Sequence, residues 1–379
     1  MGCLFTISQG TSGTNEHVIR NNLSSSIARY RITLHLNQYL GDEMDIDERE
    51  DCRSRLEKVV KVVGEQLLSY TGDVEDMGDI MDHGHDISTV DEEARNTMAC
   101  ALEAEFPDRD LTLQFELHPY KIKSQMHPKE PLHFVIDEID GTTNFKRWAA
   151  SSRTYRPHAA VCIAAFSSMS LESLQVGVIF TLDEQEVHSG IRLTSEFGRF
   201  RAYRNGTPLV IPSSKQGDKT NRVLVIGYSS KVRIRKAEIE KAICNLTSGA
   251  GKEKRNYRVY EGCRSSTMDI VSIIRNQYDA YIDPRAVFGD ETETRLETYD
   301  VAAVLPTAYG CNLLISDIYG RPLTEYNWDD PLPLLVARPE VYNQLCDTIV
   351  ELSEKGGIIP DYKEWRHILE KDRKERQKK

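Results

Sequence analysis

The sequence predicts a globular protein of the layered α/β class, and three observations support this. A chain of 379 residues with 40% hydrophobic content can bury the core of one large domain or two packed subdomains. The first half combines segments of helical spacing with segments in which apolar residues alternate with period two. The second half alternates short apolar runs with helical patterns. Such alternation implies sheets covered by helices.

The first 50 residues are expected to lie outside the main fold. Residues 1–26 are rich in Ser, Thr, Asn and Gly and are predicted to be a flexible leader. Residues 27–50 form an N-terminal extension, in which the period-two pattern from Tyr30 to Leu36 predicts a strand. The start of the chain fits the pattern for myristoylation of Gly2, with Cys3 open to palmitoylation. Because such short patterns often arise by chance, we expect membrane contact only if Gly2 or Cys3 is lipidated.

Residues 51–212 are predicted to form an N-terminal α+β subdomain. A helical pattern runs from Leu56 to Leu68, and acidic residues precede it, where the dipole of a helix stabilises negative charge. A second helix is expected from Val90 to Glu105. Strands are expected after it near 110–117, near 133–137, in two runs within 159–180, and in a segment that turns at Asn205-Gly206. This half therefore mixes helices and strands.

Residues 213–360 are predicted to form a C-terminal α/β subdomain. The polar segment 213–221 indicates the break between the halves. After it, strands are expected at 223–226, 279–283 and 312–315, and helices near 233–246, near 265–276 and from about Asp300. Residues 361–379 are strongly charged and are expected to be a helical tail with a solvated face or frayed end.

Composition excludes several classes of function. A net charge of −11 argues against a protein that binds nucleic acid through bulk electrostatics. The eight cysteines are scattered without a Cys-x-x-Cys pair, which indicates neither a zinc site nor a disulfide framework. No apolar run approaches the roughly 20 residues that span a bilayer. We therefore expect a soluble, cytoplasmic protein.

The most informative segment is the turn that follows the apolar run 134–136. It carries two carboxylates, Asp137 and Asp140, followed by Gly141 and by the hydroxyl and amide groups of residues 142–144. Carboxylates at positions i and i+3 around a turn can face one hard cation, and the N–H groups that open a helix can bind an anion. Composition alone favours an acidic turn without any ligand, because Asp, Gly and Thr form such turns in many proteins.

The order of residues 135–145 decides between these interpretations. Val-Ile-Asp-Glu-Ile-Asp-Gly-Thr-Thr-Asn-Phe strongly resembles the Asp-Pro-Ile-Asp-Gly-Thr-Thr-Asn-Phe signature of the inositol monophosphatase family. These are magnesium-dependent, often lithium-sensitive phosphomonoesterases, and they include archaeal-type fructose-1,6-bisphosphatases. The resemblance implies a layered αβαβα sandwich and makes residues 51–212 the metal-binding subdomain.

The resemblance also implies a set of metal ligands. Asp137 bridges two metals, Asp140 binds the second, and the carbonyl oxygen of Ile139 joins the first. Glu116 occupies the place of the first Glu in the family's Gly-Glu-Glu, and Asp300 that of the Asp in Trp-Asp-x-Ala-Ala. Together these positions imply two or three Mg²⁺ ions and inhibition by Li⁺.

A catalytic pair and a phosphate site follow from the same resemblance. Asp91 matches the Asp of the family's Thr-x-x-Asp, which pairs with the first Thr of the signature, here Thr142, to orient and deprotonate the attacking water. Without the resemblance, Asp91 is explained as an acid in the first turn of a helix. Gly141, Thr142 and Thr143 are the implied phosphate-binding residues.

Three further positions are candidates for substrate binding. Asp283 matches the acidic residue that accepts substrate hydroxyls in the family. Arg264 stands in the glycine position of the family's Gly-Ser-Ser motif, and Arg285 lies two residues after Asp283. Either arginine could bind a second phosphate or be a structural ion-pair partner.

The chain departs from the family pattern at four places near the implied site: Phe115 for Gly, Leu117 for Glu, Glu138 for Pro and Arg264 for Gly. We nevertheless predict a magnesium-dependent phosphomonoesterase that hydrolyses a small sugar or inositol phosphate. The alternatives are a 3′-phosphoadenosine phosphate phosphatase, or a non-catalytic relative that binds sugar phosphates or other proteins. Because family members often dimerise, the resemblance also leaves a homodimer open.

Overall fold

The computed structural model describes most of the chain from Met44 onward. The described ranges are 44–71, 76–82, 85–115, 119–124, 129–151, 153, 155–168, 170–211, 220–227, 233–246, 256–291 and 295–376. Gly2, Cys3, the leader and the strand expected from Tyr30 to Leu36 lie outside these ranges, and so do most of the residues of the expected break at 213–221.

The acidic segment before the first apolar helix starts helix α1 (Ile46–Ser69). The Asp45 side chain accepts a hydrogen bond from the backbone N–H of Glu48 (2.9 Å), and the Glu48 carboxylate accepts one from the N–H of Asp45 (3.3 Å). This reciprocal capping satisfies two N–H groups that the helix itself cannot pair. The sequence-based prediction of acids at a helix N-terminus is confirmed.

Among the described residues, a large sheet of eight strands organises the first half. All neighbouring strands in it are antiparallel except β3 and β5, which run parallel. In spatial order the strands are β10 (Thr207–Pro208), β9 (Phe200–Arg204), β8 (Glu186–Arg192), β7 (Leu174–Thr181), β6 (Ala160–Phe166), β5 (Lys129–Asp140), β3 (Arg109–Gln114) and β4 (Pro119–Ile122).

A second sheet, of five strands among the described residues, organises the other half. Its strand β11 pairs in parallel with both neighbours, whereas β15 pairs antiparallel with both of its neighbours. The spatial order is β12 (Asn256–Tyr260), β11 (Thr220–Val225), β13 (Ala280–Asp283), β15 (Leu334–Ala337) and β14 (Leu314–Asp317). A separate pair, β1 (Asp76–Asp82) and β2 (His85–Ser88), forms a two-stranded ribbon.

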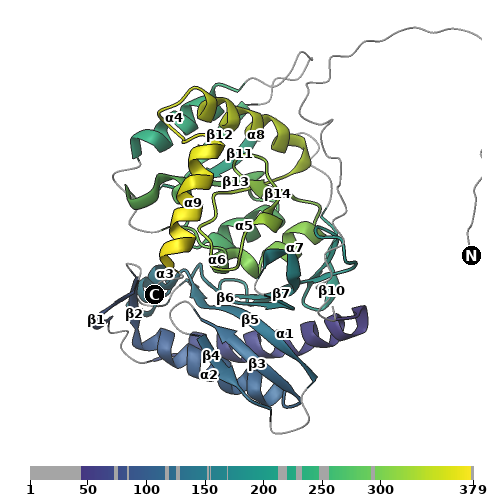
Figure 1. The fold of residues 1–379 in the computed structure, drawn as a ribbon. Coiled ribbons are helices and arrows are strands. Elements are labelled where there is room, and N and C mark those ends of the chain that lie inside the picture. Colours follow the sequence, from purple (N-terminus) through teal and green to yellow (C-terminus); the bar gives the residue numbers. More distant parts are fainter. Residues whose placement is uncertain are drawn as a thin grey trace, which may run out of the picture. The chain divides into compact units, whose positions relative to one another are not determined.

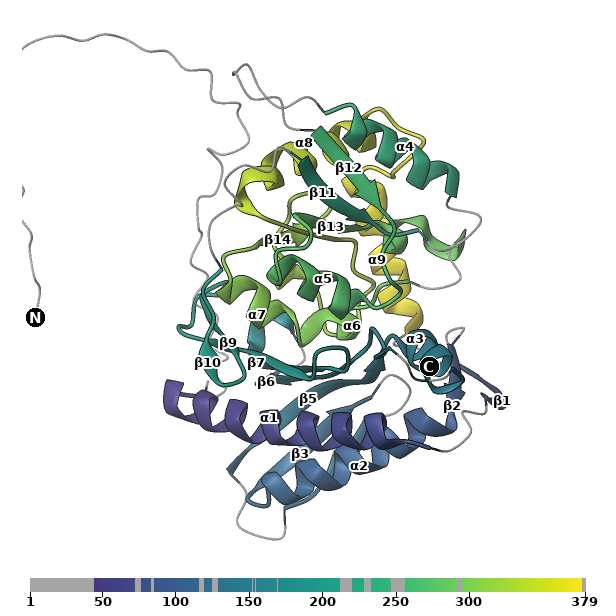
Figure 2. The same ribbon diagram turned by 180° about the vertical axis from the view of Figure 1, so that it is seen from behind.

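Helices and sheets alternate in layers (Figures 1 and 2). Helices α1 and α2 (Thr89–Glu105) cover one face of the first sheet. The layer between the sheets contains α5 (Ser266–Ile274), α6 (Tyr299–Ala302) and α7 (Leu305–Gly310), and α4 (Arg233–Cys244) and α8 (Pro339–Glu354) lie against the second sheet from its other side. The predicted αβαβα sandwich is confirmed.

The middle layer approaches the first sheet closely at two glycines. A β-carbon on Gly177 of β7 would collide with the carbonyl oxygen of Ala303, and one on Gly190 of β8 would collide with the backbone of Pro306. The absence of side chains at these positions lets the α6–α7 segment lie directly on the sheet. Helix α6, which carries Asp300, thereby lies against strand β5 of the sheet.

The charged C-terminal segment is helical and has an exposed face, as expected, but its other face is packed on the rest of the fold. It forms α9 (Tyr362–Arg376), in which Trp365 and Leu369 are fully buried. The indole N–H of Trp365 donates to the Tyr326 hydroxyl (3.1 Å), and Arg373 Nε donates to Asp330 Oδ1 (2.9 Å). The charges dominate the composition, yet one apolar face is enough to dock the helix.

Within the described residues, no helix is long and apolar enough to cross a membrane.

Candidate active site

The signature turn follows the end of β5. Asp137 pairs in register with Cys162 of β6, and the ladder shifts register before Asp140, which pairs with Ala160. Gly141 then has φ +92°, and a β-carbon there would lie 3.0 Å from both the His158 carbonyl oxygen and the Ser265 β-carbon. Left-handed backbone and close packing both require glycine at this point.

Helix α3 (Thr142–Ala149) opens directly from this turn. Gly141 is its N-cap residue and offers no side-chain hydrogen bond, and the N–H groups of Asn144 and Phe145 are the first that reach the Gly141 carbonyl (2.8 and 3.1 Å). The N–H groups of the first helical residues cannot be paired within a helix. The positive end of α3 therefore lies next to the signature carboxylates and suits an anion.

The structure brings together Asp91 and Thr142, the pair that the sequence suggested for water activation. Asp91 is in the first turn of α2, and its Oδ1 lies 3.5 Å from Thr142 Oγ1. The same hydroxyl lies 2.9 Å from the carbonyl oxygen of Ile139. Residues separated by 51 positions thus meet at one hydroxyl group, whose single proton can be donated to either oxygen.

Asp140 is almost fully buried and is held by neutral donors. Its Oδ2 accepts hydrogen bonds from the Ser265 hydroxyl (2.8 Å) and from the backbone N–H of Thr267 (2.7 Å). Burial raises the pKa of Asp140, and these hydrogen bonds act in the opposite direction. A buried carboxylate with uncharged partners is a favourable position for a cation.

Asp300 approaches from the middle layer. Its Oδ2 accepts the backbone N–H of Glu297 (2.8 Å), and its carbonyl oxygen accepts the Thr267 hydroxyl (3.0 Å). Burial raises the pKa of the Cys162 thiol, and the negative charges of Asp137, Asp140 and Asp300 raise it further. The negative charges of three carboxylates, from two segments far apart in the sequence, therefore act on one buried thiol.

Glu116 and Leu117 lie outside the described residues, so the position of this implied ligand stays a prediction. Phe115, just before them, is buried in the core between the first sheet and its outer helices. The other departure in this region, Glu138, is also buried, and its Oε1 accepts a hydrogen bond from Arg95 Nε (2.7 Å). The Arg95 guanidinium lies 5.6 Å from the centroid of the Phe115 ring. One arginine on α2 thus contacts both departures.

The candidates for substrate binding are placed differently. Asp283 is fully buried at the end of β13, and its carboxylate pairs with the Arg285 guanidinium (2.7 Å) and accepts the Tyr281 hydroxyl (2.8 Å). This favours the structural ion-pair interpretation of Arg285. Arg264 adopts φ +65°, the left-handed region in which glycine is normally found.

Sequence reasoning assigned no role to several residues that shape the site. Ser265 and Thr267 hold Asp140, and the Asn144 amide donates to the carbonyl oxygens of both His158 (2.8 Å) and Cys263 (2.7 Å). Arg95 could have been found, because it lies four residues after Asp91 and so on the same face of α2. The His158 and Cys263 contacts have no comparable signal in the sequence.

Comparison with solved structures identifies the class of fold. Similar structures include an IMPase of Thermotoga maritima (15% identity, TM-score 0.57, 81% of this chain and 100% of that chain) and inositol monophosphatase II of Staphylococcus aureus (18%, 0.54, 81% and 98%). The extragenic suppressor protein SuhB of Bartonella henselae is another (14%, 0.56, 78% and 97%). The layered sandwich is therefore the fold of the inositol monophosphatases.

The family itself follows from a sequence model. The model of the inositol monophosphatase family matches residues 48–353, so the chain belongs to this family. Comparison with curated proteins found no match. Family membership and the structural neighbours together support a phosphatase, that is, a phosphoric monoester hydrolase.

Proposed function

We propose that this protein is a magnesium-dependent phosphomonoesterase that hydrolyses a small sugar or inositol phosphate. The observation that carries the proposal is that Thr267 donates both to Asp140 Oδ2 (2.7 Å) and to the carbonyl oxygen of Asp300 (3.0 Å), beside the N-terminus of α3. Asp137 lies on the same strand as Asp140, three residues before it. Hard oxygen donors gathered next to a helix N-terminus suit a divalent cation and a phosphate group together.

The donor set fits Mg²⁺. Carboxylate oxygens and the Ile139 carbonyl are hard ligands, which Mg²⁺ prefers to nitrogen or sulfur. The family is Mg²⁺-dependent, and one similar structure is an IMPase/NADP phosphatase complexed with Mg²⁺ and phosphate. We propose Asp137, Asp140, Asp300, Glu116 and the Ile139 carbonyl as ligands for two or three ions, with inhibition by Li⁺. When bound, Mg²⁺ polarises the phosphoryl oxygens and lowers the pKa of water.

The protein's own groups supply the remaining chemistry. The carboxylate of Asp91 accepts a hydrogen bond from the Thr142 hydroxyl. The hydroxyl oxygen can then accept a hydrogen bond from the attacking water and orient it. The N–H groups at the start of α3, with Gly141, Thr142 and Thr143, bind the phosphate oxygens. These groups hold the phosphorus atom in a fixed position relative to the water. Such positioning is a main source of rate acceleration in phosphoryl transfer.

The proposed substrate class rests on the signature and on the neighbours. A similar structure of the staphylococcal enzyme contains bound inositol monophosphate, and the Gly141-Thr142-Thr143 sequence resembles the inositol phosphatase version of the motif. Asp283 and Arg285 are occupied by their mutual ion pair. We therefore assign no second phosphate site to Arg285, which favours a monophosphate ester.

The test is phosphate release by the purified full chain from inositol, sugar and nucleotide phosphates, with and without Mg²⁺. Asp137→Asn is expected to abolish Mg²⁺-dependent release. Asp110→Asn is the matched control, because Asp110 is on β3, pairs with Lys123 at the surface (2.9 Å) and lies outside the proposed site. Equal rates in Asp137→Asn and wild type, or no release from any ester, would reject the proposal in favour of a non-catalytic relative.

A second variant pair tests the roles of Asp91 and Thr142. Asp91→Asn and Thr142→Val are each expected to lower kcat by about 10²–10³-fold, as expected for the loss of one proton acceptor or positioning group. Mg²⁺ binding, measured by calorimetry, should change little in Asp91→Asn, because Asp91 is not a proposed ligand. A loss of binding that equals the loss of rate would show that Asp91 acts as a ligand instead.

A further inference from the structure

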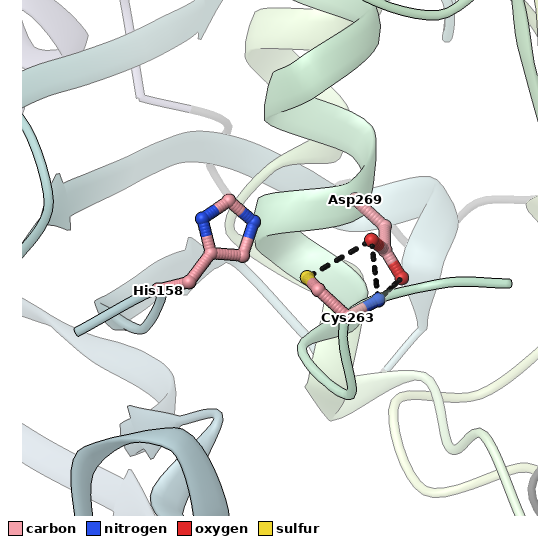
Figure 3. Close-up of side chains that lie close together, drawn as sticks. All are labelled: His158, Cys263 and Asp269. Carbon is pink, nitrogen blue, oxygen red and sulfur yellow. Dashed lines mark hydrogen bonds between the residues drawn. The ribbon is translucent and has the colours of Figure 1, made fainter. Parts of the chain in front are cut away.

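A second group of potential ligands lies beside the signature turn and has a different chemistry. His158 precedes β6, Cys263 follows β12, and Asp269 is in the first turn of α5. One ligand atom from each residue lies within 4.8 Å of the other two. Figure 3 shows the three side chains directed toward one another. Sulfur, imidazole nitrogen and carboxylate oxygen together are typical ligands of zinc rather than of magnesium.

The histidine is oriented as a metal ligand requires. Its Nδ1 lies 3.5 Å from Asp183 Oδ2, while the other ring nitrogen faces Cys263 and Asp269. An N–H at Nδ1 directed to a carboxylate leaves Nε2 as the lone-pair donor. Histidine ligands of zinc commonly have this outer carboxylate, which fixes the tautomer and raises the basicity of the ligating nitrogen. Asp183 is itself held by Arg275 (2.8 Å), so its position is defined.

The backbone that carries these ligands is also fixed. The Asn144 amide donates to the carbonyl oxygens of His158 (2.8 Å) and Cys263 (2.7 Å), which ties the two segments together. Asp269 is almost fully buried, and its Oδ1 accepts hydrogen bonds from both the backbone N–H (3.0 Å) and the thiol (3.0 Å) of Cys263. Pairing with Cys263 explains the position of Asp269, but it does not explain why His158 turns its second nitrogen to the same place.

The Cys263–Asp269 pair needs only a small adjustment to accept an ion. Tetrahedral zinc with Zn–S of about 2.3 Å and Zn–O of about 2.0 Å separates sulfur from oxygen by about 3.5 Å. Cys263 Sγ and Asp269 Oδ1 are now 3.0 Å apart, as a hydrogen-bonded pair. His158 is 37% exposed, so the fourth ligand position can be open to water. Three protein ligands and one open position are the usual arrangement in non-structural zinc sites.

We propose that His158, Cys263 and Asp269 form a binding site for a thiophilic divalent cation, of which Zn²⁺ is the fitting example. The site is distinct from the proposed magnesium ligands in its residues and in its sulfur donor. It is nevertheless connected to them, because Ser265, two residues after Cys263, donates to Asp140 (2.8 Å). Binding converts the Cys263 thiol to a thiolate, and its proton is released to solvent.

The test uses Co²⁺ and Zn²⁺ alone with the reduced, purified full chain. One equivalent of Co²⁺ should produce a thiolate-to-cobalt charge-transfer band in the near ultraviolet. Zn²⁺ should displace the Co²⁺, so that the band disappears. Cys263→Ser should abolish the band, and His158→Ala should weaken Zn²⁺ binding at least tenfold in competition with a chromophoric chelator. Cys100→Ser is the matched control, because Cys100 is an exposed cysteine remote from this cluster in sequence, and it should leave the band unchanged.

The possible results separate this site from the phosphatase site. Absence of the band in wild type, or its persistence in Cys263→Ser, would overturn the proposal; persistence would point to Cys162 beside the carboxylates instead. If Cys263→Ser does not fold, as judged by circular dichroism, the affinity of His158→Ala decides, and an unchanged affinity rejects the site. Because the readout is a spectrum, it does not depend on whether the chain hydrolyses any phosphate ester.

Discussion

Two buried carboxylates in different parts of the molecule are stabilised in opposite ways. Asp283, at the end of β13, is paired with the guanidinium of Arg285, so its charge is compensated within the protein. Asp140, at the end of β5, receives hydrogen bonds from a hydroxyl and a backbone N–H, which carry no net charge. The first arrangement is complete as it stands, whereas the second retains an excess negative charge that a cation can balance.

The strongest test of this comparison is Asp140→Asn. The amide keeps an acceptor for Ser265 and Thr267 but removes the charge, so phosphatase activity should fall by about 10⁴-fold, which corresponds to about 5 kcal/mol. Burial raises the pKa of Asp140, because it disfavours the charged form of the carboxylate relative to the form in water. The free energy of unfolding in chelator should therefore be unchanged or higher in the variant. A large loss of stability would show that Asp140 is structural.

The opposite result is expected for Arg285→Met. Removing the guanidinium leaves the fully buried Asp283 carboxylate uncompensated, which should lower the free energy of unfolding by about 3–5 kcal/mol. Urea denaturation with and without Mg²⁺ measures the effect. If Asp283 and Arg285 instead bind substrate, the variant should retain its stability and raise KM, and the comparison with Asp140 would fail.

A smaller effect is expected where two departures from the family pattern share Arg95. Glu138→Gln and Arg95→Met should each lower the free energy of unfolding by about 1–3 kcal/mol. Each variant removes one charge of the ion pair and leaves the other charge, which is partly or fully buried, without an opposite charge beside it. The double variant should be less destabilised than the sum of the two, with a coupling free energy of about 1–3 kcal/mol. Additive losses in denaturant unfolding would mean that the ion pair contributes no coupling.

The smallest expected effect is at Arg264. Its φ of +65° is unfavourable for a residue with a β-carbon, so Arg264→Gly should raise the free energy of unfolding by about 1 kcal/mol. If Arg264 also binds substrate, the same variant should raise KM. Stability and KM measured together therefore separate the backbone role of this position from a role in binding. A lower free energy of unfolding would show that the contacts of the Arg264 side chain stabilise the fold by more than the positive φ destabilises it.

Much of the fold and the order of the site residues could be predicted because their signals are local. The helix expected from Val90 to Glu105 is α2 (Thr89–Glu105), and the turn at Asn205-Gly206 joins β9 and β10 with positive φ at both residues. Family resemblance named Asp91 and Thr142, which the structure places 3.5 Å apart.

The remaining features depend on partners that the sequence does not reveal. The helix expected from Asp300 is divided into α6 and α7, with Pro306 in the first turn of α7. The short apolar run of β15 (Leu334–Ala337) is buried on both faces, so it shows no alternation by which a strand could be recognised. The pairing of Arg95 with Glu138 and the meeting of His158 with Cys263 require contacts between distant segments, for which a single sequence carries no signal.

The hydrogen bonds to Asp140 also have a consequence for folding. Its partners Ser265 and Thr267 lie 125 and 127 residues later in the chain, so they meet Asp140 only after a very long loop has closed. Contacts of such sequence separation form slowly compared with the hairpins of the first sheet. During synthesis, β5 and its turn therefore emerge long before Ser265 and Thr267, so the hydrogen bonds to the Asp140 carboxylate form only once the second half of the chain has been made.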